Sequence, residues 1–208
     1  MGAAERYDVS VMGKEDMDYG RPALIVWDMQ NGIARNAINF DQLLRNVRML
    51  IDTCHTSNIP IIYSQHTGLP SEFQSKYMRL SLQRRGVPEG STFMAEGSQE
   101  WGIVKQLVPL QGKDIVLQKH TASFFVGTPL EQLLRNRGIE AIILCGVATE
   151  AGIEGTARHA SQLGFYPVIV EDAVGSRNQE LHENSLNVMR QMFEVQPTEE
   201  TVHKLRRA

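Results

Sequence analysis

Short runs of apolar residues alternate with segments of helical periodicity along most of the chain. Residues 23–27 form a continuous apolar run, which is typical of a strand covered on both faces. Further strands are expected at 59–63, 114–118, 141–145, 166–170 and 193–195. Helices are expected at 43–54, near 99–107, at 128–136, 150–163 and 178–192, and from 198 onward. Strands separated by helices imply right-handed crossovers, so the pattern predicts a three-layer α-β-α sandwich with a six-stranded parallel sheet.

The ends of the chain and one internal segment depart from this alternation. Residues 1–20 are polar without a clear period and are expected to form an N-terminal arm, so that residues 21–208 make one domain. Residues 67–98 are rich in Gly, Ser, Arg and Glu and are expected to be irregular. They should overhang the carboxyl edge of the sheet.

The composition of the chain argues against nucleic-acid-binding, disulfide-stabilised and membrane-spanning proteins. The chain has 208 residues, 42% of them hydrophobic, and a formal net charge of −3, which argues against a nucleic-acid partner because that usually requires a clustered basic face. Its two cysteines give no disulfide framework. No signal-peptide core and no membrane-spanning apolar run is found in the sequence, so the expected location is the cytoplasm.

Polar residues follow three of the predicted strands. Asp28 follows A-L-I-V-W, Lys119 follows D-I-V-L-Q, and the turn G-V-A-T-E-A-G at 146–152 follows the strand 141–145. In an open parallel sheet, sites form outside the carboxyl ends of the strands, where strand order reverses. Each segment alone is a weak signal, since a strand-ending aspartate is usually a turn residue and a lysine there is usually a solvated edge charge.

Together and in this order, the three segments resemble the isochorismatase-like, or cysteine hydrolase, superfamily. The resemblance covers about residues 20–200 and continues into V-E-D-A at 170–173. It implies a Rossmann-like sheet in a homodimer or homotetramer, and a non-proline cis peptide between Val147 and Ala148. In the family's amidases the aspartate deprotonates a cysteine and the lysine steadies negative charge. Carried over, Asp28 is the acid/base and Lys119 its electrostatic partner.

The departure from this family pattern is at the nucleophile, because Gly152 stands where the amidases carry a cysteine. Cys145 lies inside a predicted apolar strand and Cys54 on the apolar stripe of a helix, so both are expected to be core residues. Ser123 and Thr149 are candidate hydroxyl nucleophiles, but a hydroxyl needs an adjacent base. The more ordinary role of Thr149 is to bond backbone groups at the start of a helix.

Candidate substrate contacts come from the same edge of the sheet and from the overhanging segment. No cofactor is expected, and no metal, because residues 29–58 lack the D-x-H pair of the family's nicotinamidases and one imidazole makes no zinc site. An arginine of the overhanging segment would suit a substrate carboxylate. The candidates are Gln65, His66, Arg79, Phe124 and Thr149, with Arg84, Arg85 and Phe125 as further possibilities and Trp27 expected mainly in the core.

Three hypotheses follow for function. The first is a hydrolase without a covalent cysteine intermediate, in which Asp28 protonates the vinyl ether of isochorismate or a related small acid. The second is a C–N hydrolase of amides or ureido acids, in which Asp28 activates water; the turn G-V-A-T-E-A-G is closer to the amidase branch than to the Tyr-His turn of isochorismatases. The third is a catalytically silent binding protein that kept the fold.

Overall fold

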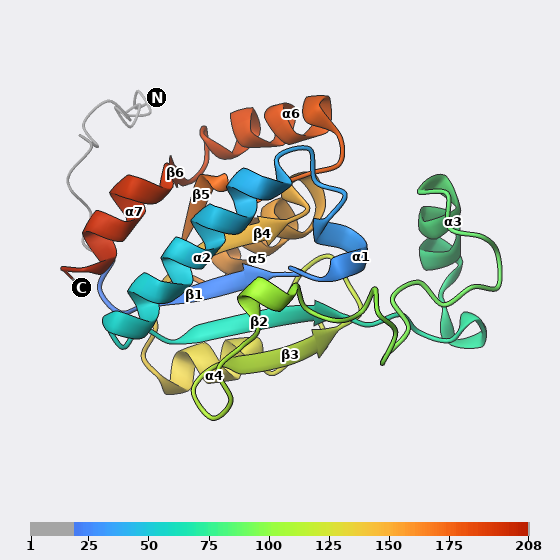
Figure 1. Ribbon diagram of the computed structural model, residues 1–208, viewed down its shortest axis with the longest axis horizontal. Coiled ribbons are helices and arrows are strands. Elements are labelled where there is room, and N and C mark those ends of the chain that lie inside the picture. Colours follow the sequence, from blue (N-terminus) through green and yellow to red (C-terminus); the bar gives the residue numbers. More distant parts are fainter. Residues whose placement is uncertain (1–18, 208) are drawn as a thin grey trace, which may run out of the picture.

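Six parallel strands form a single sheet in this computed structural model, which describes residues 19–207. The strand order is β3-β2-β1-β4-β5-β6, and every neighbouring pair is parallel. The predicted three-layer α/β fold is therefore confirmed (Figure 1). The strands are β1 (Pro22–Trp27), β2 (Ile61–His66), β3 (Ile115–Lys119), β4 (Ala141–Val147), β5 (Tyr166–Gly175) and β6 (Glu194–Gln196).

Helices cover both faces of the sheet. The helices α2 (Phe40–Thr56) and α7 (Thr198–Leu205) pack on one face, and α4 (Leu130–Asn136), α5 (Glu154–Gln162) and α6 (Gln179–Met189) pack on the other. Every residue of β1 and of β4 is buried, because these central strands have a helical layer on each side. The continuous apolar run expected for a doubly covered strand is thus explained by its position in the sheet.

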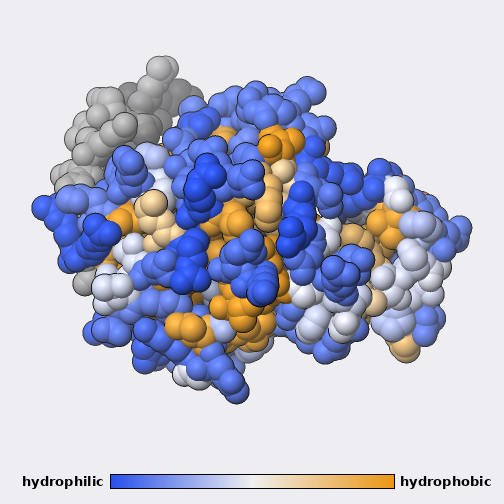
Figure 2. All heavy atoms as spheres, viewed as in Figure 1, coloured by the Kyte–Doolittle hydropathy of each residue, from blue (hydrophilic) through white to orange (hydrophobic). Residues whose placement is uncertain are grey.

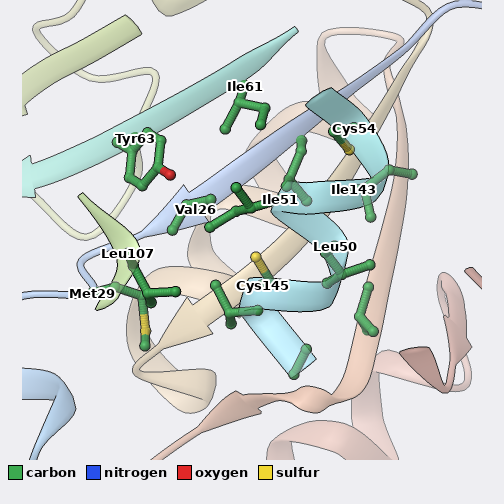
Figure 3. Close-up of a cluster of buried hydrophobic side chains, with 14 of the residues drawn as sticks. Val26, Met29, Leu50, Ile51, Cys54, Ile61, Tyr63, Leu107, Ile143 and Cys145 are labelled. Atoms are coloured by element: carbon green, nitrogen blue, oxygen red, sulfur yellow. The ribbon is translucent and has the colours of Figure 1, made fainter. Parts of the chain in front are cut away.

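Both cysteines lie in the hydrophobic core. Figure 3 shows Cys54 of α2 and Cys145 of β4 among aliphatic side chains that include Leu50, Ile51 and Ile143. Burial raises the pKa of the Cys54 thiol to about 12 and raises that of Cys145 as well. The structure confirms both as core residues, and neither thiol is available as a nucleophile.

The segment expected to be irregular contains a helix. Residues 67–98 include a 3₁₀ turn, η2 (Ser71–Phe73), and the helix α3 (Lys76–Arg84), which begins at the cap Ser75 and extends away from the sheet (Figure 1). None of its residues is buried, so it lacks the wide apolar stripe by which a core helix is recognised in sequence. A short helix, α1 (Asn31–Ala34), was also missed, and the helix expected near 99–107 is only the 3₁₀ turn η3 (Lys105–Leu107).

The outer surface is mixed. Figure 2 shows hydrophobic residues gathered near the middle of one face, over η3 and the edge strand β3, where Val108, Leu110, Ile115 and Val116 are exposed. Within residues 19–207 no helix is long and apolar enough to cross a membrane. The predicted N-terminal arm falls almost entirely on residues 1–18, outside the part of the chain that the structure describes.

Candidate active site

The order in which the chain forms neighbouring strands reverses between the central strands β1 and β4. The polar residues that follow the strands lie together at this point, at the carboxyl edge of the sheet. From β1 the chain continues to β2 on one side, whereas β4 continues to β5 on the other. Such a switch point leaves a crevice between the loops that leave the two strands. Asp28 directly follows β1, Lys119 is the last residue of β3, and the turn 146–152 follows β4.

Asp28 and Lys119 form a buried ion pair. The Nζ atom of Lys119 lies 2.7 Å from Oδ2 of Asp28, and the two side chains are 0% and 2% exposed, respectively. The hydroxyl of Ser64, on β2, donates to Oδ1 of Asp28 at 2.5 Å and accepts from the Asp28 backbone N–H at 3.0 Å. Asp28 itself has a φ of 44°, a left-handed conformation that is costly for a residue with a Cβ and that these contacts hold in place.

Burial is the dominant influence on the proton affinity of this pair. It raises the pKa of the Asp28 carboxyl, against the lowering effects of the Lys119 ammonium and of the hydrogen bonds from Lys119 and Ser64. It lowers the pKa of the Lys119 ammonium, against the raising effect of Asp28. The two pKa values are therefore drawn toward each other, which makes it easier for Asp28 to hold or release a proton during a reaction.

The turn after β4 brings backbone close to this pair. The peptide bond between Val147 and Ala148 is cis, at the position that the resemblance implied. The carbonyl of Ala148 then accepts from the backbone N–H groups of Ala151, Gly152 and Ile153, in a π-helical turn, η4 (Thr149–Ile153), that leads into α5. π-Helical turns of this kind are frequent at functional sites.

Gly152 is buried against the side chain of Trp27, the last residue of β1. The indole Nε1–H of Trp27 donates to Oγ1 of Thr156 at 2.9 Å, and the ring face lies 3.6 Å from the Lys119 Nζ atom, measured to the ring centroid. The space beside Gly152 is thus occupied by an aromatic ring. Trp27 is 4% exposed and belongs to the core, as expected, but it also lines the cavity described next.

A cavity of about 320 Å³ lies over the ion pair. Its floor contains Trp27, Asp28 and Lys119, together with Val147 and Ala148 of the cis peptide. The opposite wall is one face of α3 and the residue after it, at helical spacing. The residues of this wall are Tyr77, Met78, Ser81, Leu82 and Arg85.

His66 alone among the five main substrate candidates lines this cavity. Burial lowers the pKa of its imidazole to about 3, with a further contribution from the Lys119 ammonium, so the ring is neutral at neutral pH. Gln65 is its neighbour on β2 and therefore points to the other side of the strand, where its side-chain amide donates to the Trp101 carbonyl at 3.1 Å. Strand alternation also places Ser64 beside Asp28, a contact that the sequence analysis missed.

Arg79, Phe124 and Thr149 do not line the cavity, and each has a structural contact instead. Arg79 lies on another face of α3, and its guanidinium donates to the Gln74 carbonyl at 2.6 Å. Phe124 is fully buried in the core. The Oγ1 atom of Thr149 lies 2.8 Å from Nδ1 of His182. Of the arginines in the overhanging segment, Arg85 is the one that reaches the cavity.

The remaining polar candidates do not assemble a second catalytic group at this cavity. Oγ of Ser123 lies 2.8 Å from Nδ1 of His159, and neither residue lines the cavity. Among residues 19–207, no group of three or more His, Cys, Asp or Glu side chains is arranged to hold a metal ion. The chemistry that this arrangement offers is proton transfer by Asp28, with the Lys119 ammonium beside it.

Comparison with known proteins agrees with the fold. The model of the isochorismatase domain matches residues 22–201. The chain belongs to the isochorismatase family. It is 30% identical over 180 residues to the isochorismatase family protein YwoC of Bacillus subtilis, covering 85% of this chain and 89% of YwoC. The family is one of hydrolases, and this chain is accordingly a hydrolase of the isochorismatase type.

Two further relatives resemble the chain over most of its length, one in sequence and one in structure. The ureidoacrylate amidohydrolase RutB of Enterobacter sp. (strain 638) is 33% identical over 172 residues, which cover 73% of this chain and 74% of RutB. The crystal structure of an isochorismatase family protein from Desulfovibrio vulgaris superposes with a TM-score of 0.77 at 25% identity. That match covers 89% of this chain and 98% of the other.

Proposed function

We propose that this isochorismatase-family protein hydrolyses a small carboxylic acid without a covalent enzyme intermediate, using Asp28 as acid/base and Lys119 as its electrostatic partner. The observation that carries the proposal is the buried Asp28–Lys119 pair on the floor of a cavity. The resemblance to the family's amidases implies that Gly152 takes the place of their cysteine. Both native thiols lie in the core, away from this cavity. The acid/base group is therefore left to act on the substrate or on water directly.

The first candidate reaction is cleavage of a vinyl ether such as that of isochorismate. Asp28, as a carboxylic acid, donates its proton to the terminal vinyl carbon and leaves an oxocarbenium ion. Water adds to this ion, its proton returns to Asp28, and the hemiketal breaks down to pyruvate and an alcohol. The raised pKa of Asp28 favours the acid form that this step needs. A bound dicarboxylate would raise that pKa further, because its negative charge opposes ionisation.

The second candidate reaction is C–N hydrolysis, and the similarity to a ureidoacrylate amidohydrolase favours it. In that case ionised Asp28 takes a proton from water, which attacks the carbonyl carbon. The Lys119 ammonium, 2.7 Å from Asp28, would stabilise the negative charge that develops on the carbonyl oxygen. The nitrogen leaves as an amine after it has received the proton from Asp28.

The charge of the cavity supports an acidic substrate. The side chains that line it include Lys119 and Arg85 as cations and Asp28 as the single carboxylate, so its formal charge is positive when His66 and His120 are neutral. Within residues 19–207 the Arg85 guanidinium makes no hydrogen bond or ion pair, and a guanidinium can bind a carboxylate through two hydrogen bonds. An apolar wall from α3 and Phe93 would hold the rest of the molecule.

The decisive experiment measures pyruvate release from isochorismate and amine or ammonia release from ureido acids, with purified wild-type protein and Asp28→Asn. Asp41→Asn, an exposed carboxylate at the start of α2, is the matched control. We expect turnover of one of the two substrate classes, lost by at least about a hundredfold in Asp28→Asn and unchanged in the control. No turnover of either class by folded wild-type protein would contradict the proposal and favour the silent binding protein.

We also infer that the protein assembles as a homodimer or homotetramer. The exposed hydrophobic side chains over η3 and β3 support this inference, since such a gathering on a soluble protein often marks an interface (Figure 2). Light scattering coupled to size-exclusion chromatography measures the assembly directly. A mass of one chain, 23.4 kDa, across the accessible concentration range would contradict it.

A further inference from the structure

Trp27 and Gly152 meet where the family's nucleophile would stand. We propose that Trp27 determines the reaction class of this site, because its indole fills the space that any side chain at position 152 would need. Trp27 and Gly152 are then one unit, which can change only together. This inference rests on the proposed reaction without a thiol intermediate and adds the residue that enforces it.

The first argument is steric. A Cβ atom built on Gly152 would lie 2.5 Å from Cε3 of Trp27 and closer still to Cζ3 and Cη2. Carbon atoms in proteins do not approach this closely, so one of the two groups would have to move. The atoms in conflict belong to a rigid ring and not to the end of a flexible chain. Even an alanine at position 152 therefore requires the indole to leave its place.

The second argument is that the indole is held firmly in that place. Its Nε1–H donates to Oγ1 of Thr156, which lies four residues after Gly152, in the helix α5 that follows the turn η4. Its face lies against the Lys119 ammonium, a contact that is stronger in a dry interior than in water. A rotation that admitted a side chain at position 152 would break the hydrogen bond and remove the ring from Lys119. A side chain at position 152 would therefore also disturb Lys119, one member of the proposed catalytic pair.

Gly155 shows that the conflict is specific to position 152. A Cβ atom built on Gly155, three residues further along the same helical segment, would meet its nearest neighbour, the Ala122 carbonyl oxygen, at an ordinary 3.6 Å. Position 155 therefore has room for a methyl group, and alanine is a better helix former than glycine. A general intolerance of side chains in this segment would affect both positions. The structure predicts an effect at one of them alone.

A consequence for catalysis is that a single substitution cannot convert this site to thiol chemistry. In Gly152→Cys the introduced sulfur competes with the indole for one space. In Trp27→Val/Gly152→Cys the space is free, and the thiol would lie near the Lys119 ammonium, a cation that favours the reactive thiolate. Valine suits the buried strand β1, where the change is made.

The first test is a double-mutant cycle in which Tm is measured by thermal unfolding. Its variants are Gly152→Ala, Trp27→Val and the double variant, with Gly155→Ala as the control. We expect Gly152→Ala to lower Tm by about 5 °C, as overpacking does in a chain of this size, and Gly155→Ala to leave it unchanged or higher. The double variant should unfold at least about 5 °C above the value expected from adding the two single changes. Additive changes, or equal losses at Gly152 and Gly155, would overturn the proposal.

The second test measures alkylation by iodoacetamide at pH 7, in which the thiolate sulfur bonds to the acetamide carbon and iodide leaves. The two native thiols are buried and provide a low background. We expect the introduced thiol of Trp27→Val/Gly152→Cys to react at least about tenfold faster than that of Gly152→Cys. Equal rates in two folded proteins would overturn the proposal, whereas a fold found only in the double variant would support it.

Neither test uses a substrate. Failure of the proposed hydrolytic function would leave both results unchanged, and failure of the Trp27–Gly152 relationship would not affect the turnover comparison with Asp28→Asn. The two conclusions are therefore separately open to contradiction.

Discussion

Lys119 Nζ lies 2.7 Å from Oδ2 of Asp28 although 91 residues separate them in the chain, and both side chains are buried. The pair spans the ends of β1 and β3, with Ser64 of the intervening strand β2 bonded to the same carboxyl. The sheet thus places a carboxyl group, its counter-charge and a hydrogen-bond donor together beneath one cavity.

Removal of Lys119 should destabilise the protein more than removal of both charges. Lys119→Met leaves the Asp28 carboxyl buried without its cation, and the expected loss in the free energy of unfolding is about 3 kcal/mol. Asp28→Asn/Lys119→Met should recover a large part of this loss. Urea unfolding of the two single variants and the double variant measures the coupling, and additive losses would show that the pair does not act as a unit.

Removal of the Ser64 hydroxyl should move the pH dependence of turnover to higher pH. The hydrogen bond from Ser64 lowers the pKa of Asp28, so Ser64→Ala should raise that pKa and extend the range in which Asp28 remains an acid. If Asp28 acts as an acid, the alkaline limb of kcat/KM moves upward. If it acts as a base toward water, the acidic limb moves upward instead. An unchanged profile would contradict a role for Asp28 in proton transfer.

His66 should make folding less favourable in acid. Its pKa is about 3 in the folded protein against 6.5 for the free side chain, so between these values the unfolded chain binds more protons. The contribution of neutral His66 to stability is present above pH 6.5 and is lost as the pH falls toward 3. Against His66→Gln, wild type should lose up to about 1 kcal/mol more per pH unit between pH 6 and 4. Parallel stability curves for the two proteins would contradict this assignment.

The face of α3 toward the cavity should affect substrate binding more than stability. Leu82 lines the cavity, whereas Leu80, on the same helix, does not and is 41% exposed. Because no residue of α3 is buried, Leu82→Ala and Leu80→Ala should each change the free energy of unfolding by less than about 1 kcal/mol. Once a substrate is identified, Leu82→Ala should raise KM and Leu80→Ala should not. Equal KM values for both variants would show that α3 takes no part in binding.

The layers of the fold, and the strands at whose ends the candidate site lies, can be predicted from the amino-acid sequence. A run such as 23–27, apolar at every position, is typical of a strand covered on both sides, and helices between such strands indicate a parallel sheet. Because parallel strands end at one edge, Asp28 and Lys119 were expected there together. These inferences depend on local periodicity and on the direction of the chain, both of which can be read without coordinates.

Tertiary structure alone decided which side chains share the cavity. Gln65 and His66 are adjacent in sequence, but strand alternation sends one to the Trp101 carbonyl and the other to the cavity. The helix α3 was missed because its apolar positions face a cavity and not a core, which leaves a weak periodic signal. The contact of Trp27 with Gly152 joins residues 125 positions apart, and such packing depends on the paths of β1 and of the turn after β4 together. Contacts of this kind depend on distances in the folded chain, and no local pattern in the sequence reveals those distances.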